Sequence, residues 1–104
     1  GGENVYPGEV EKLIERCPGV AQAAVVPVAD EIKGAIPIAF VVRHPGATVD
    51  EAAVRQFTLA NGPAYAHPRV VAFRDVLPVA STHKIDRAAL IAEAQAFARH
   101  HRQS

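Results

Sequence analysis

The sequence predicts an α+β fold, in which three helices cover a small mixed or antiparallel sheet of about three to five strands. Three stretches carry apolar residues at helical spacing, and three others are rich in Val, Ala and Ile with little polar interruption. The elements follow one another in the order helix, strand, strand, helix, strand, helix. With 104 residues, 49% of them hydrophobic, we expect a single domain over residues 1–104.

The first helix is expected to begin at Pro7, where the missing N–H costs nothing, and to stop at Pro18-Gly19. Its apolar positions recur at i, i+3, i+4 and i+7, namely Val10, Leu13, Ile14 and Cys17. Because Cys17 completes this stripe, packing in the core is favoured over a role as nucleophile. A lone cysteine also excludes an internal disulfide and is typical of a reducing compartment.

Two strands are predicted next, over residues 20–28 and 35–42. The first is almost continuously apolar, which indicates a strand buried on both faces. A short turn separates the two, so we expect an antiparallel pair. Pro37 removes one donor from the ladder, and the second strand therefore starts late, bulges or has an edge there.

The second helix is expected to begin with a capping box formed by Thr48 and Glu51 and to end at Asn61-Gly62-Pro63. Its predicted apolar stripe consists of Val49, Ala52, Ala53, Phe57 and Ala60. A short third strand follows over residues 69–73.

The last helix is expected to have Asp86 as its N-cap, because a carboxylate accepts hydrogen bonds from the free N–H groups of a first turn. Its apolar stripe is Leu90, Ile91, Ala94, Phe97 and Ala98. We expect the tail, residues 100–104, to be frayed. His100 and His101 are adjacent and diverge on a helix, so a solvated pair is favoured over a metal site.

Charge and motifs exclude several function classes. Eleven acidic and eleven basic residues leave no net charge and no basic stripe, which argues against a nucleic-acid partner. No apolar stretch reaches membrane-spanning length and no signal-peptide pattern is present, so we expect a cytoplasmic protein without an integral membrane segment. No Ser-His-Asp arrangement, P-loop or metal-spaced Cys/His set occurs, and we expect no metal site of the chain's own.

The polar turn before the last helix holds Lys84, one of only three lysines. A long cation at the tip of a loop can reach a group outside its own fold, although a solvated lysine beside a helix start is the simpler interpretation. Gly1 and Gly2 also have both a functional and a simpler interpretation. Two glycines let a backbone approach a narrow ligand closely, but a cloning scar explains them equally well.

Four blocks of the sequence together resemble one family. Residues 1–11 look like the "GGENVYPxEVE" segment of the adenylate-forming enzymes, a superfamily of acyl-CoA synthetases, luciferases and adenylation domains. Residues 24–26 and 34–41 resemble its middle strands, and residues 65–69 resemble its "YKxPR". Residues 77–78 followed by 81–87 resemble its "LPxTxxGKIDRR". The blocks run in the family's order along the whole chain, which therefore resembles the small mobile C-terminal domain of such an enzyme.

The resemblance implies a two-step reaction. A small-molecule carboxylic acid attacks the α-phosphorus of Mg²⁺-bound ATP to give an acyl-adenylate and pyrophosphate, and the thiol of CoA then attacks the adenylate. Lys84 matches the catalytic lysine of the family, and Gly1, Gly2 and Glu3 match the segment that lines the pantetheine tunnel. ATP, Mg²⁺ and CoA would be bound mostly by a large N-terminal domain, the implied partner of this one, and the isolated domain is expected to be inactive.

Two departures from the family pattern stand out. His83 replaces the glycine that usually precedes the lysine, and it either restricts how Lys84 is presented or contacts phosphate when protonated. Ala66 replaces a lysine, which leaves Arg69 or His67 as candidates for contacting a CoA phosphate, or as ordinary surface groups.

Two alternatives to a CoA ligase remain open at this stage. In the first, a carrier-protein phosphopantetheine accepts the acyl group, or the adenylate is oxidised instead. In the second, the chain is an interaction module that kept the fold without the chemistry, to which His83 and Ala66 lend some support.

Overall fold

The computed structural model describes residues 7–30, 34–63, 67–68 and 70–103. Within them, helices and strands follow the predicted order. Their bounds are α1 Pro7–Glu15, β1 Val20–Asp30, β2 Gly34–Arg43, α2 Glu51–Asn61, β3 Val70–Phe73 and α3 Arg87–Gln103.

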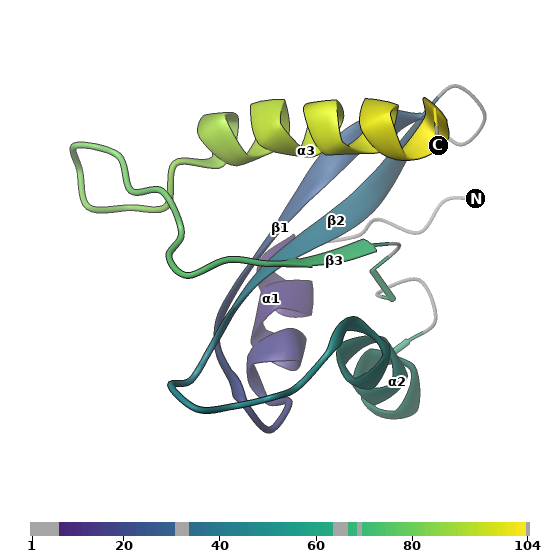
Figure 1. Ribbon diagram of the computed structural model, residues 1–104, viewed down its shortest axis with the longest axis vertical. Helices are drawn as coiled ribbons and strands as arrows, with labels where there is room; N and C mark the ends of the chain where they lie inside the picture. The colour runs from purple at the N-terminus through teal and green to yellow at the C-terminus, as the bar shows by residue number, and fades with distance from the viewer. Residues whose placement is uncertain (1–6, 31–33, 64–66, 69, 104) are drawn as a thin grey trace.

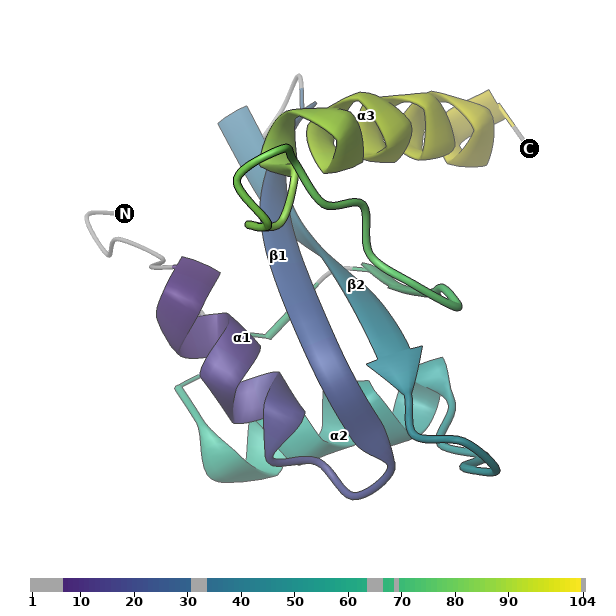
Figure 2. The ribbon, with the colours of Figure 1, turned by 90° about the vertical axis from the view of Figure 1, so that its left-hand side faces the viewer.

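The sheet has the strand order β1-β2-β3 (Figure 1). β1 and β2 are antiparallel, as predicted, whereas β2 and β3 are parallel. The sheet is therefore mixed, which agrees with the predicted fold class. The two helices α1 and α2 lie on one face and α3 lies on the other, so the molecule has three layers (Figure 2).

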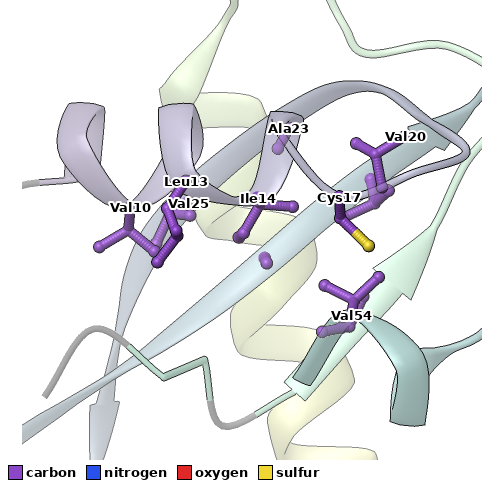
Figure 3. Close-up of a cluster of buried hydrophobic side chains, with 11 residues drawn as sticks. Val10, Leu13, Ile14, Cys17, Val20, Ala23, Val25 and Val54 are labelled. Atoms are coloured by element: carbon purple, nitrogen blue, oxygen red, sulfur yellow. The ribbon is translucent and has the colours of Figure 1, made fainter. Parts of the chain in front are cut away.

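Both faces of β1 are buried, as its continuous apolar run predicts. Ala23 and Val25 point toward α1 and α2, and they belong to the cluster shown in Figure 3. Ala24 and Val26 point to the opposite face and pack with Leu90 of α3. The alternation of the strand thus places successive side chains in two different cores.

Cys17 lies in the first of these cores, 5% exposed, where burial raises the pKa of its thiol. The prediction that it packs rather than reacts is consistent with this position, since a raised pKa disfavours the reactive thiolate.

Pro37 lies inside β2, which begins at Gly34, so the strand does not start late at this proline. It pairs with Pro27 across β1 and β2, and neither residue has an N–H to donate at that position. Among the described residues, β3 pairs with β2 from Ile38 to Val41. The register shift in the β1–β2 pair occurs instead between Val20 and Gln22.

Glutamates of the helices cover outer edges of the sheet. In α1, Glu15 accepts from the N–H of Ala23 at 3.1 Å and Glu11 accepts from the N–H of Val25 at 2.7 Å. Four residues of helix rise about 6 Å and two residues of strand span about 6.6 Å, so both carboxylates fit the same edge. At the other edge, Glu51 of α2 accepts from the N–H of Val71 at 2.8 Å.

The start of α2 differs from the prediction. The N-cap is Asp50, whose Oδ1 accepts from the N–H of Ala53 at 2.8 Å, and the predicted capping box of Thr48 and Glu51 is wrong. The helix begins at Glu51, so Thr48 lies too early to cap it. The Glu51 carboxylate bonds to the backbone of β3 instead.

The predicted apolar stripe of α2 is wrong in part. Val49 and Phe57 are half-buried against the core, but Ala52, Ala53 and Ala60 are exposed. The fully buried positions are Val54 and Thr58, four residues apart. Burial of a methyl side chain contributes little free energy, and alanine favours helix formation whether it is buried or exposed. Alanines therefore predict the buried face of a helix poorly.

The start of α3 agrees with the prediction. Oδ1 of Asp86 accepts from the N–H of Ala89 at 3.0 Å, which makes Asp86 the N-cap. Leu90 and Ala94 are both 0% exposed. The tail that we expected to be frayed continues α3 to Gln103. The side chains of residues 97–103 lie outside the described part, among them Phe97, Ala98 and the two histidines.

Candidate functional site: the Lys84 turn

The segment between β3 and α3 forms a closed turn that carries Lys84. Val79 and Ile85 make an antiparallel bridge, and the N–H of Ala80 donates to the carbonyl of Lys84 at 2.8 Å. At the base, the N–H of Asp86 donates to the carbonyl of Pro78 at 2.9 Å. These backbone bonds fix the path of the chain on both sides of Lys84.

Apolar side chains anchor both ends of this turn. Leu77 is 6% exposed and lies in the same core as Leu90, and Ile85 packs against that core from the other end. The tip of the loop extends beyond the first turn of α3 (Figure 1). The turn is therefore held at its base and free at its tip.

Lys84 itself is exposed, as its polar surroundings predicted. Among the residues that the structure describes, none forms a salt bridge with its ammonium group. Two apolar side chains lie near it in sequence and are also exposed, Val76 at 67% and Val79 at 57%. A second domain that covered this region could bury the apolar side chains and contact the ammonium group of Lys84.

His83 adopts the left-handed conformation, with φ of 65°. Its N–H donates to the carbonyl of Ala80 at 2.9 Å, which makes a tight turn immediately before Lys84. A glycine takes this conformation without strain, whereas histidine is one of the few other residues that tolerate it. The substitution therefore keeps the backbone path at a cost in strain.

An ion pair joins the beginning of α3 to α1. Nη1 of Arg87 lies 2.7 Å from Oε2 of Glu11, and Nη2 lies 3.0 Å from Oε1, so the guanidinium binds the carboxylate with two parallel bonds. Nη1 also donates to the carbonyl of Val25 at 3.3 Å. The pKa of Arg87 is raised, chiefly by the hydrogen bonds to Glu11. Sequence reasoning missed this pair, because its members are 76 residues apart.

His67 is engaged within the domain. The Thr58 hydroxyl donates its one proton to the carbonyl of Arg55 at 2.9 Å, so at 3.1 Å from Nδ1 of His67 it can only accept. Nδ1 therefore carries the proton, and Nε2 accepts from Nε of Arg55 at 3.3 Å. Burial lowers the pKa of His67, and the charge of Arg55 lowers it further. This imidazole is neutral and has both nitrogens occupied.

The remaining predicted site residues, Gly1, Gly2, Glu3 and Arg69, lie outside the described residues. Within the described ranges, no group of three His, Cys, Asp or Glu side chains is arranged to hold a metal ion. The described helices include none that is both long and apolar enough to cross a membrane.

An open groove of about 920 Å³ lies along the end of β2, β3 and α3. Two arginines line it, and both are engaged within the domain. Arg43 lies 3.7 Å above the ring of Phe73 and donates to the carbonyl of Val49, and Arg74 pairs with Glu93 of α3. The groove is consequently a poorer anion site than the Lys84 turn.

The helix-covered mixed sheet is similar to the C-terminal domain fold of adenylate-forming enzymes of known structure. The family model described as AMP-binding enzyme C-terminal domain matches residues 9–84. The chain belongs to this family, and the resemblance seen in the sequence is confirmed.

Several proteins similar to this chain are named as CoA ligases. A propanoyl:CoA ligase of Mycobacterium tuberculosis, whose acyl group carries a methyl-dioxo-octahydroindenyl ring system, is 45% identical over 87 residues, covering 84% of this chain and 17% of its own. A 2-succinylbenzoate–CoA ligase of Geobacillus kaustophilus is 42% identical over 87 residues, with 84% and 18% covered. ATP-bound MatB of Rhodopseudomonas palustris is similar in fold, with a TM-score of 0.85 and 36% identity over 91% of this chain and 19% of that one.

This chain spans less than a fifth of the length of the curated relatives that it matches.

Proposed function

We propose that this chain is the C-terminal domain of an ATP-dependent acyl-CoA synthetase, and that Lys84 is its catalytic residue. The observation that carries the proposal is an exposed lysine on a turn whose base is fixed by backbone bonds and buried side chains. The position of this lysine in the family's sequence block supports the same role. The ATP and acyl pockets belong to a larger N-terminal domain, in keeping with the short span of this chain.

The chemistry requires a cation at the right moment. When a carboxylate attacks the α-phosphorus of ATP, negative charge gathers on the phosphate oxygens and on the departing pyrophosphate. A lysine placed against them stabilises the transition state, and removing one such group typically costs about 10²–10³-fold in rate. Mg²⁺ accompanies ATP as its counter-ion, and the lysine adds a charge that can enter and leave with a moving domain.

The second half-reaction transfers the acyl group to the thiol of CoA. We assign Gly1, Gly2 and Glu3 to the pantetheine tunnel and Arg69 to a CoA phosphate. His67 is the weaker candidate for the phosphate, because both of its ring nitrogens are bonded within the domain. We place the enzyme in the cytoplasm, since the one cysteine is buried and reduced and needs no oxidising compartment.

The test is pyrophosphate exchange by the full-length enzyme carrying Lys84→Ala. We expect exchange to fall about 10²–10³-fold. The thioester step, started from preformed acyl-adenylate, should change far less. Lys12→Ala is the matched control, because Lys12 is an exposed lysine on α1. Undiminished exchange in the Lys84 variant would remove this residue from the proposed role.

The acceptor of the acyl group is tested separately. The full-length enzyme is given preformed adenylate with either free CoA or a phosphopantetheinylated carrier protein. We expect thioester with free CoA. Thioester formed only with the carrier protein would assign the chain to the carrier-dependent branch of the superfamily.

A further inference from the structure

We propose that Arg87, through its ion pair with Glu11, is a positioning residue that holds the Lys84 turn in place for adenylation. The inference rests on the proposed function and adds a residue to it. Arg87 is three positions after Lys84 and is the first residue of α3. Besides the buried Leu77 and Ile85, it thus ties the turn that carries the lysine to a different part of the fold.

The contacts around Arg87 join three elements. Its guanidinium binds both carboxylate oxygens of Glu11 in α1 and the carbonyl of Val25 in β1. Glu11 in turn accepts from the N–H of Val25 at 2.7 Å. The carboxylate and the guanidinium therefore share one backbone residue of β1, and they bridge α1, β1 and α3.

The burial of the two partners is unequal. The Glu11 side chain is 11% exposed, whereas that of Arg87 is 45% exposed. Glu11 is a fixed anchor, held by the sheet edge, and Arg87 is the movable partner that reaches down to it. Two parallel bonds set the orientation of the guanidinium, and they set the position of the first turn of α3 with it.

This anchor lies where the backbone bonds of the turn end. The last of them is donated by Asp86, and the buried contacts of α3 begin at Leu90. Arg87 stands between these two points. A shift of about 1 Å in a catalytic group can lower a rate by about 10²-fold. Loss of the Arg87–Glu11 pair would therefore slow the reaction if it displaced Lys84 by a similar distance.

The test uses the full-length enzyme and pyrophosphate exchange. Arg87→Met keeps a long side chain and removes both bonds, and we expect exchange to fall about 10–10²-fold. Arg87→Lys should recover part of this loss, because a lysine keeps the charge without the two parallel bonds. Glu11→Gln removes the charge of the other partner at the same volume, and it should lower exchange in the same direction.

Arg74→Met is the matched control. Arg74 and Glu93 form another arginine–glutamate pair that ties α3 to the end of β3, away from the start of the helix. We expect exchange within about twofold of the unmodified enzyme, since contacts distant from a site act independently of it. An equal loss in the Arg74 and Arg87 variants would overturn the inference, because any broken ion pair would then have the same effect.

A double variant separates positioning from general weakening. If Arg87 acts through Lys84, then Lys84→Ala combined with Arg87→Met loses no more exchange than Lys84→Ala alone. If the two losses multiply, Arg87 acts independently of the lysine and the inference is wrong. Should Arg87→Met fail to fold, Glu11→Gln replaces it in the same cycle.

The outcomes also separate this inference from the proposed function. Full exchange with Lys84→Ala would refute the proposed function, and this inference with it. A loss with Lys84→Ala, accompanied by normal exchange with both Arg87→Met and Glu11→Gln, would refute only the positioning role.

Discussion

Replacing His83 by glycine should stabilise the turn that carries Lys84. His83 has φ of 65°, and a residue with a Cβ in this left-handed region is strained by roughly 1–2 kcal/mol. Glycine avoids that strain, but it loses more conformational freedom on folding, at roughly 0.5–1 kcal/mol. The His83 side chain is exposed, so little contact energy is lost with it. The net effect is a gain of about 0.5–1 kcal/mol.

Thermal unfolding followed by circular dichroism measures this effect. For a chain of this size, the gain corresponds to a rise of about 2–8 °C in Tm. His83→Ala is the control, because alanine removes the imidazole and keeps the Cβ, and its Tm should not rise. A lower Tm for the glycine variant, or an equal rise for the alanine variant, would show that the conformation of His83 is not strained.

Two other predictions concern His67 and the glycines with positive φ. The pKa of His67 is lowered, so the unfolded chain binds more protons; its contribution to stability is present above about pH 6.5 and is lost as the pH falls below it. The urea midpoint should thus decrease more between about pH 7.5 and pH 5.5 in the unmodified chain than in His67→Gln, and equal decreases would contradict this. Gly19 and Gly46 have φ of 94° and 83°, but only at Gly19 would a Cβ meet a side chain, Val49 at 3.1 Å. Gly19→Ala should therefore unfold at lower urea than Gly46→Ala, and the reverse order would refute the crowding argument.

The elements that the sequence predicted well are those set by neighbouring residues. Asp86 caps α3 because its carboxylate needs only the N–H groups of the next turn. The end of the first helix was predicted less accurately, since α1 ends at Glu15, before the Pro18-Gly19 pair that was expected to stop it. The burial of both faces of β1 was also predicted from neighbouring residues, because its apolar side chains follow one another without interruption and alternate between two cores. Signals of this kind are complete within a few residues of sequence.

The predictions that failed depended on distant partners. Glu51 fits a capping box by spacing, but the N–H of Val71 lies within its reach, and the carboxylate bonds there. Asp50, one residue earlier, then caps α2. Glu11 lies near the start of the first helix, where a carboxylate favours the helix dipole, but in the structure it also binds Arg87 and an edge of the sheet. In each case a tertiary contact determines the role of an acidic residue that has a valid local explanation.

These carboxylates also bear on where a partner can dock. At one edge of the sheet the N–H groups of Val25 and Ala23 donate to Glu11 and Glu15, and at the other edge the N–H of Val71 donates to Glu51. A partner strand could not pair at these positions without displacing them. We therefore expect a partner domain to contact turns and helix surfaces. The segment between β3 and α3 offers the cation Lys84 together with the exposed side chains of Val76 and Val79. A lysine on such a turn can be withdrawn by a rotation of the domain without breaking any bond in the sheet, as the two half-reactions of the proposed function require.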